Sequence, residues 1–149
     1  VDAIIGVYWT SESIIMENEG HESNVLMPDD WGVPSYYELV LVTSEDNVKN
    51  NSEMVEKFVK AFNKGYSAAA DDPQGSIETM LRLNPDAEID EATDREGVEL
   101  LAPLWKSAGA PVGSLDEARW DSLVTWMKGE GLLNDSLKAA DAYDASFSK

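Results

Sequence analysis

Cysteine is absent from this chain of 149 residues, and histidine occurs once, as His21. Without thiols the chain has no disulfide, no thiolate metal site and no cysteine nucleophile. One imidazole in a polar segment argues against a histidine-rich metal site and against a Ser-His-Asp triad. We expect no metal site, and we assign no cofactor and no catalytic residue. We interpret His21 as a solvated loop residue.

Basic residues are scarce, with 11 Lys and Arg against 29 Asp and Glu, which gives a net charge of −18. Such a surface repels phosphates, so we expect no nucleic-acid partner. The acidic residues are dispersed along the chain, as is typical of proteins that stay soluble in high salt. A saline source is therefore a hypothesis, and a stability that rises with added salt would support it, because screening relieves self-repulsion.

Long hydrophobic runs are also missing, and no stretch is apolar enough to span a membrane. We recognise no signal peptide, because the chain opens on apolar residues that read like the middle of a core strand. A length of 149 residues with 43% hydrophobic residues suits a single core. We expect one domain, or one lobe of a larger protein.

Three apolar segments predict β-strands, at residues 1–8, 24–27 and 36–43. The first and third are nearly continuous apolar runs, which suit strands covered on both faces, as in a parallel sheet. The breaker-rich residues 28–34 predict a linker, and the polar residues 44–51 predict a loop.

Apolar residues at helical spacing, with caps and breakers, predict the helices. A short helix should start after Thr10 or Ser11 and end near Gly20, and a capping box from Ser114 to Glu117 should open a later helix that ends at Gly129. Further helices are expected from residue 52 to about 72, at 74–83, at 91–105 and, weakly, at 139–143.

The predicted strands are too few for the helices, and they come early while the helices come late. A complete α/β domain alternates the two more evenly. We infer that partner strands are missing from this chain or are supplied by another copy of it.

Three segments together resemble a known family: VDAIIGVYWTSE, DDWGVPSYYELVLVTSED and NNSEMVEKFVKAFNKGYSAAADDPQGSIETML. They are similar to the carboxy-terminal half of ABC-transporter substrate-binding proteins of the ThiY-like group, and to the related SsuA-like taurine- and sulfonate-binding proteins. The resemblance extends to about Tyr143. It implies an incomplete, helix-rich α/β lobe of the type 2 periplasmic-binding-protein fold with few strands. Residues 1–34 would form the end of the second lobe and a crossover, and residues 35–149 the carboxy-terminal part of the first lobe.

The same resemblance implies a non-enzymatic, extracytoplasmic solute-binding component of an uptake transporter. Its partners would be a small heterocycle, such as a pyrimidine precursor of thiamine, and the transporter's membrane subunits. Pyrimidine synthases share the fold but need a histidine and a metal-binding cysteine motif, so an enzyme is the weaker alternative. A truncated fragment that binds nothing and forms a homodimer through exposed strand edges is another alternative.

The segment GVYWTSE, residues 6–12, is the main candidate for the ligand site. Ligands of open α/β sheets bind beyond the carboxyl ends of strands, where this segment is expected. Gly6 permits close approach, Tyr8 or Trp9 can stack on a planar ring, and the Glu12 carboxylate can accept hydrogen bonds from an exocyclic amine. The resemblance matches Tyr8 and Glu12 to the aromatic and the carboxylate that hold the aminopyrimidine.

Ordinary packing remains the alternative for these side chains, with Glu12 as an acid that complements the helix dipole. Tyr36 and Tyr37 are further ligand candidates on the expected crossover, where alternation points them in opposite directions, and hinge packing is an equal alternative. We interpret Trp105, Trp120 and Trp126 as core residues, because they fall on predicted helices at positions suited to burial.

Overall fold

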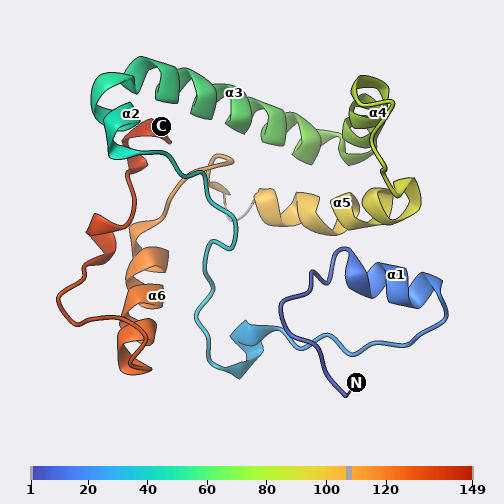
Figure 1. Ribbon diagram of the computed structural model, residues 1–149, viewed down its shortest axis with the longest axis horizontal. Coiled ribbons are helices and arrows are strands. Elements are labelled where there is room, and N and C mark those ends of the chain that lie inside the picture. The colour runs from blue at the N-terminus through green and yellow to red at the C-terminus, as the bar shows by residue number, and fades with distance from the viewer. Residues whose placement is uncertain (1, 107–108, 149) are drawn as a thin grey trace. The chain divides into compact units, whose positions relative to one another are not determined.

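The computed structural model describes residues 2–106 and 109–148. The chain forms two compact units (Figure 1). The first unit combines Val1–Val25 with Phe62–Val112, and the second combines Leu26–Ala61 with Gly113–Lys149. Each unit therefore joins segments that are distant in sequence, and each is described by itself below.

The first unit is built around α5 (Glu91–Trp105). This helix packs against α1 (Glu12–Asn18) and against α4 (Pro73–Leu83), and Figure 1 shows α1 running alongside it. Residues 62–71 of α3 (Ser52–Asp71) also belong to this unit. The Tyr66 ring of α3 meets the Trp105 ring of α5 edge to face, with centroids 5.0 Å apart.

The second unit contains α6 (Glu117–Gly129) and the shorter helices around it. The 3-10 helix η3 (Ala139–Asp141) packs against α6. The remaining elements are η1 (Pro28–Trp31), α2 (Glu45–Asn50), residues 52–61 of α3 and η4 (Ala145–Phe147).

The predicted helices are confirmed in α1, α3, α4, α5 and α6, whereas the predicted helical segment at 139–143 forms only the 3-10 helix η3. Aspartate caps fix several starts: the carboxylate of Asp72 accepts from the backbone N–H of Gly75, and that of Asp90 from Thr93. The predicted capping box at Ser114 is wrong. Asp116 caps α6 instead, because its Oδ1 accepts from the backbone N–H of Ala118 at 2.7 Å.

The predicted loop at 44–51 is also wrong, because residues 45–50 form α2. Ser44 caps this helix by accepting a hydrogen bond from the backbone N–H of Asn47. Glu45 and Lys49 then form an i,i+4 ion pair. The polar composition that indicated a loop is that of a short, solvent-exposed helix.

The strands predicted at 1–8, 24–27 and 36–43 are wrong for the part of the chain that the structure describes, where no residue is in a strand. Ile5 is 98% exposed and Val42 is 87% exposed. A strand needs a hydrogen-bonding neighbour and a covered face, and the described segments provide neither. The fold observed here is helix-rich, and the expected homodimer through strand edges loses its structural basis.

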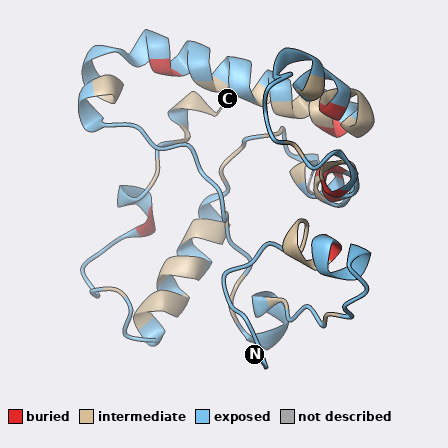
Figure 2. Ribbon diagram, turned by 45° about the vertical axis from the view of Figure 1, so that its right-hand side comes forward, coloured by how far each residue is buried: buried red, intermediate tan, exposed pale blue. Residues whose placement is uncertain are grey.

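The core is small in both units (Figure 2). The described buried apolar residues are Ile14, Val55, Ala70, Ile77, Val98, Ala102 and Ala139. Trp105, Trp120 and Trp126, expected in the core, are half-buried. Among the described helices, none has the length and apolar character that crossing a membrane requires.

Candidate functional site

The GVYWTSE segment forms a tight turn that leads into α1. The Tyr8 carbonyl accepts hydrogen bonds from the backbone N–H groups of Ser11 and Glu12, both at 3.0 Å. The Glu12 Oε2 atom in turn accepts from the backbone N–H of Tyr8 at 2.8 Å. The carboxylate is therefore fixed against the turn that carries the aromatic pair.

The side chains of this turn differ in exposure. Tyr8 is 45% exposed, whereas Trp9 and Glu12 are half-buried. Gly6 has a φ of +82°, a left-handed conformation that glycine adopts without strain. The turn thus presents an accessible phenol ring next to a partly desolvated, oriented carboxylate.

Gly97 of α5 supports this turn from behind, and the sequence analysis did not identify it. A Cβ atom on Gly97 would lie 2.4 Å from the Thr10 carbonyl oxygen and 3.9 Å from Ile14 Cδ1. The absence of a side chain at Gly97 is therefore what allows the turn to approach α5. A glycine inside a predicted helix was the only signal in the sequence.

An N-terminal cap and hydrogen bonds to α4 order α5. Hydrogen bonds from the Thr93 hydroxyl and backbone N–H hold the pKa of Asp90 below its ordinary value. Arg95 Nη1 donates to the Gln74 Oε1 at 2.9 Å, and Gln74 Nε2 donates to Glu99 at 2.7 Å. The neutral Gln74 amide of α4 thus bonds with two charged side chains of α5, and these charge-assisted hydrogen bonds join the two helices.

The candidates Tyr36 and Tyr37 belong to the second unit, apart from the first four. Tyr36 is exposed, and its role as a ligand contact stays a prediction. The Tyr37 hydroxyl accepts from the backbone N–H of Asp116 at 2.8 Å, and the Arg119 guanidinium lies 4.7 Å from its ring centroid. Tyr37 is thus engaged with the start of α6, and its role as a ligand contact stays a prediction.

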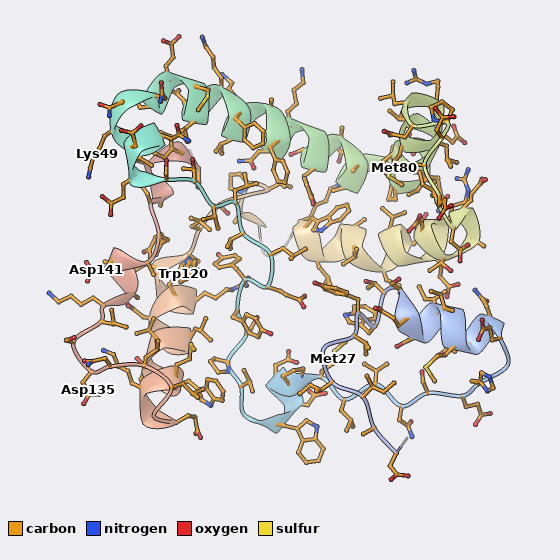
Figure 3. All side chains as sticks on the ribbon, viewed as in Figure 1. Met27, Lys49, Met80, Trp120, Asp135 and Asp141 are labelled. Carbon is orange, nitrogen blue, oxygen red and sulfur yellow. The ribbon has the colours of Figure 1, made fainter. Side chains whose placement is uncertain are left out.

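Trp120 joins Tyr37 and Tyr143 in an aromatic cluster on α6, where Figure 3 labels it. Its ring centroid is 6.1 Å from that of Tyr37 and 5.2 Å from that of Tyr143, which stacks on it at 11°. Burial raises the pKa of the Tyr143 hydroxyl, and the nearby charge of Glu117 adds to the effect. This cluster fastens the carboxy-terminal segment to α6.

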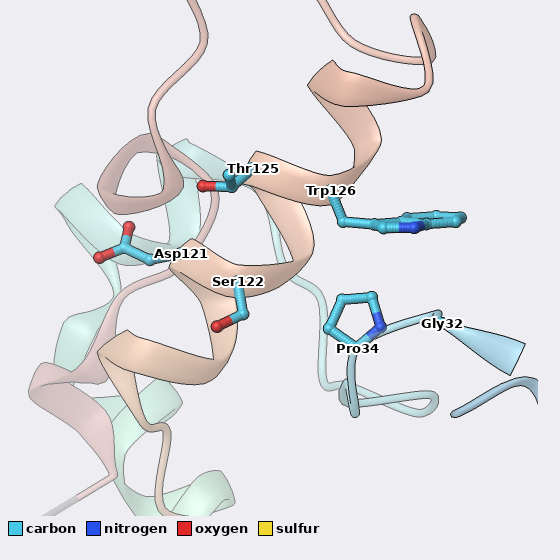
Figure 4. A pocket seen from close by; sticks show the side chains of 6 residues that line it. All are labelled: Gly32, Pro34, Asp121, Ser122, Thr125 and Trp126. Carbon is cyan, nitrogen blue, oxygen red and sulfur yellow. The ribbon is translucent and has the colours of Figure 1, made fainter. Parts of the chain in front are cut away.

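An open hollow of about 470 Å³ lies on the second unit, between α6 and the segment after η1. It is lined by Gly32, Pro34, Asp121, Ser122, Thr125 and Trp126. In Figure 4, the Trp126 ring projects from α6 above Pro34 and Gly32, whereas Asp121 and Thr125 project from the opposite side of the helix. The polar groups do not converge, which makes this hollow a poor ligand site by itself.

His21 is exposed, as expected for a loop residue. Across residues 2–106 and 109–148, no three His, Asp or Glu side chains are grouped closely enough to hold a metal ion. The predicted ligand residues are thus divided: Gly6, Tyr8, Trp9 and Glu12 share one segment of the first unit, and Tyr36 and Tyr37 lie in the second.

Three curated proteins are similar to the chain over nearly its whole length. The formylaminopyrimidine-binding protein of Halalkalibacterium halodurans is 27% identical over 146 residues, which are 97% of this chain and 44% of that protein. The riboflavin-binding protein RibY of Chloroflexus aurantiacus is 26% identical, over 94% of this chain and 40% of that protein. A putative thiamine biosynthesis protein of Haemophilus influenzae is 26% identical, over 92% of this chain and 42% of that protein.

The chain therefore spans less than half the length of the curated relatives it matches. The model of one protein family, described as NMT1/THI5 like, matches residues 1–76. The match includes the Tyr8–Glu12 turn together with Tyr36 and Tyr37, and it covers just over half of the 149 residues. On this evidence the chain belongs to the NMT1/THI5 like family.

Proposed function

We propose that this chain is part of the solute-binding component of an ABC uptake transporter, and that its ligand is a small planar nitrogen heterocycle such as a thiamine pyrimidine precursor. The observation that carries this proposal is the geometry of the Tyr8–Glu12 turn. An accessible aromatic ring and an oriented carboxylate stand on one turn, with the carboxylate 2.8 Å from the Tyr8 backbone N–H. This combination suits a ring that carries an exocyclic amine.

The two carboxylate oxygens of Glu12 have separate roles in this proposal. Oε2 is held by the backbone N–H of Tyr8. Oε1 then accepts the hydrogen bond from the ligand's amine, and the Tyr8 ring stacks on the heterocycle. Trp9 and Gly6 complete this side of the site. Tyr36 and Tyr37 stay proposed ligand contacts of the second unit, taken by itself. A ligand that brings its own donor is favoured, because the charge of the half-buried Glu12 carboxylate strengthens the hydrogen bond that it accepts.

The names of two relatives support the ligand class. One relative is named for binding formylaminopyrimidine and another for binding riboflavin, and both compounds contain a planar nitrogen heterocycle. The four candidate residues of the first unit carry no cation, so the site does not suit the sulfonate group of taurine.

The wider roles follow the same proposal. The ligand is bound without chemical change, outside the cytoplasm, and passed to the transporter's membrane subunits. Residues 1–34 form the end of the second lobe with the crossover, and residues 35–149 form part of the first lobe. The exposed apolar segments at residues 3–7 and 39–42 would then meet strands of a more complete protein.

Titration calorimetry of the 149-residue chain with formylaminopyrimidine, riboflavin and taurine tests the proposal. We expect saturable heat with formylaminopyrimidine, weaker or no binding of riboflavin, and no heat with taurine. If riboflavin binds more tightly than formylaminopyrimidine, the proposed ligand becomes a larger heterocycle of the riboflavin type. Taurine bound more tightly than both would contradict the ligand class. The absence of heat with all three at millimolar concentration would show that this chain holds no working site.

A further inference from the structure

We infer that Gly97 is a positioning residue for ligand binding. Because it has no side chain, the Tyr8–Glu12 turn can pack directly against the backbone of α5, and this contact fixes the position of the turn. This inference rests on the proposed function, because it names the residue that sets the position of the same site. Gly97 touches no ligand in this scheme. It acts through the backbone of Thr10, which lies between Trp9 and Ser11.

The contact is a close approach of two backbones. A Cβ atom on Gly97 would lie 2.4 Å from the Thr10 carbonyl oxygen, a distance that real Cβ atoms essentially never show. The hydrogen that Gly97 carries in that direction therefore faces the carbonyl oxygen, the arrangement of a weak Cα–H···O bond. Because a backbone oxygen cannot rotate away as a side chain can, an added methyl group must displace the turn or the helix.

The surroundings favour displacement of the turn. Gly97 shares a buried face of α5 with Thr93 and Val98, and the helix also packs against α4. Helix α1, which follows the turn, contacts α5 less extensively than α4 does. Ile14 of α1 lies close to Gly97, with its Cδ1 3.9 Å from the same Cβ position. We therefore expect the turn, which is less buried than α5, to be displaced together with Tyr8 and Glu12.

A displacement of the turn has a direct consequence for the site. The hydrogen bonds within the turn join Tyr8 to Ser11 and Glu12, so the aromatic ring and the carboxylate move together with the Thr10 carbonyl. A binding site tolerates little misplacement of its polar groups, because hydrogen bonds weaken steeply with distance and angle. Gly97 thus belongs to the binding machinery although it lies behind the turn.

Amide hydrogen exchange of Gly97→Ala, combined with calorimetry against formylaminopyrimidine, tests the inference. We expect the amides of Tyr8, Ser11 and Glu12 to exchange at least about tenfold faster, while the amides of α4 and α5 keep their protection. Affinity for formylaminopyrimidine should fall by about tenfold. Gly65→Ala is the matched control, because Gly65 is also a helical glycine of the first unit and a Cβ there would meet nothing within 4 Å.

Hydrogen exchange tests the positioning role of Gly97, and calorimetry tests the proposed ligand binding. Unchanged exchange at the turn, or an equal loss of protection through α4 and α5, would overturn the positioning role. Exchange at the turn could instead become faster in a chain that binds no formylaminopyrimidine. This result would support the contact between Gly97 and the turn but not its role in ligand binding, so it would overturn the inference as stated. A purely structural glycine would change stability without changing the turn selectively.

If Gly97→Ala does not fold, hydrogen exchange of the unsubstituted chain still tests whether α5 fixes the turn. The amides of Ser11 and Glu12 should then be protected to within about tenfold of the Leu101 amide in α5, because the turn opens only when it leaves that helix. Exchange of these amides as fast as those of the exposed Ile4 and Ile5 would contradict a turn fixed by α5.

Discussion

Glu12→Gln is expected to raise the dissociation constant for an aminopyrimidine by about 10- to 100-fold, because it removes the charge from the hydrogen bond to the exocyclic amine. The substitution keeps an oxygen at the same position. This oxygen can still accept from the backbone N–H of Tyr8, the contact that Glu12 Oε2 makes at 2.8 Å. The turn should therefore survive, so that the loss of affinity reports the carboxylate itself. Titration calorimetry with formylaminopyrimidine measures the change.

Glu17→Gln is the matched control for this experiment. Glu17 is an exposed carboxylate on the same helix, and its substitution changes the net charge of the chain by the same amount. It should leave the affinity within about twofold of the unsubstituted chain, because exposed charges are screened over short distances. Equal affinities of both variants would contradict a ligand contact at Glu12 and leave this residue as an acid of the first helical turn.

Ile77→Ala is expected to lower the free energy of unfolding by about 2–5 kcal/mol, which is enough to disrupt a unit with so small a core. Ile77 is 5% exposed on α4, the helix that packs against α5. Alanine is the better helix former, so a loss cannot come from helix propensity and must come from the vacated space. Urea titration followed by circular dichroism at the helical band measures the change.

Leu83→Ala provides the comparison within the same helix. Leu83 is 64% exposed at the end of α4, so its truncation should change the free energy of unfolding by about 0.5 kcal/mol at most. Equal effects of the two substitutions would contradict the view that packing between α4 and α5 stabilises the core of the first unit. A large effect of Ile77→Ala alone would confirm it.

Much of the helical structure could be predicted from the sequence, because the helical signals are local. Pro73 at the start of α4, and the aspartate caps Asp72 and Asp90, lie within a few residues of the helices they open. The capping box at Ser114 failed for a similarly local reason. The helix begins at Glu117, so Asp116 and not Ser114 stands at the N-cap position, where its carboxylate accepts from the first helical N–H groups.

Strands could not be predicted in the same way, because their partners are not local. The apolar run from Leu39 to Val42 has the composition of a buried strand, but composition does not reveal whether a neighbouring strand exists. The same limit applies to the site. The Tyr8–Glu12 turn lies within one short segment and was accessible to sequence reasoning, whereas Gly97 approaches it from 87 residues beyond Thr10.

The exposed run from Leu39 to Val42 also bears on how readily this chain aggregates at high concentration. Its four consecutive apolar side chains are exposed, and we expect them to associate with the same segment of other copies when the concentration is high. Glu38 on one side and Glu45 and Asp46 on the other are gatekeepers, because stacked copies would bring their like charges together. Added salt weakens that protection while it relieves repulsion within each molecule, so ionic strength has opposite effects on colloidal stability and on the fold.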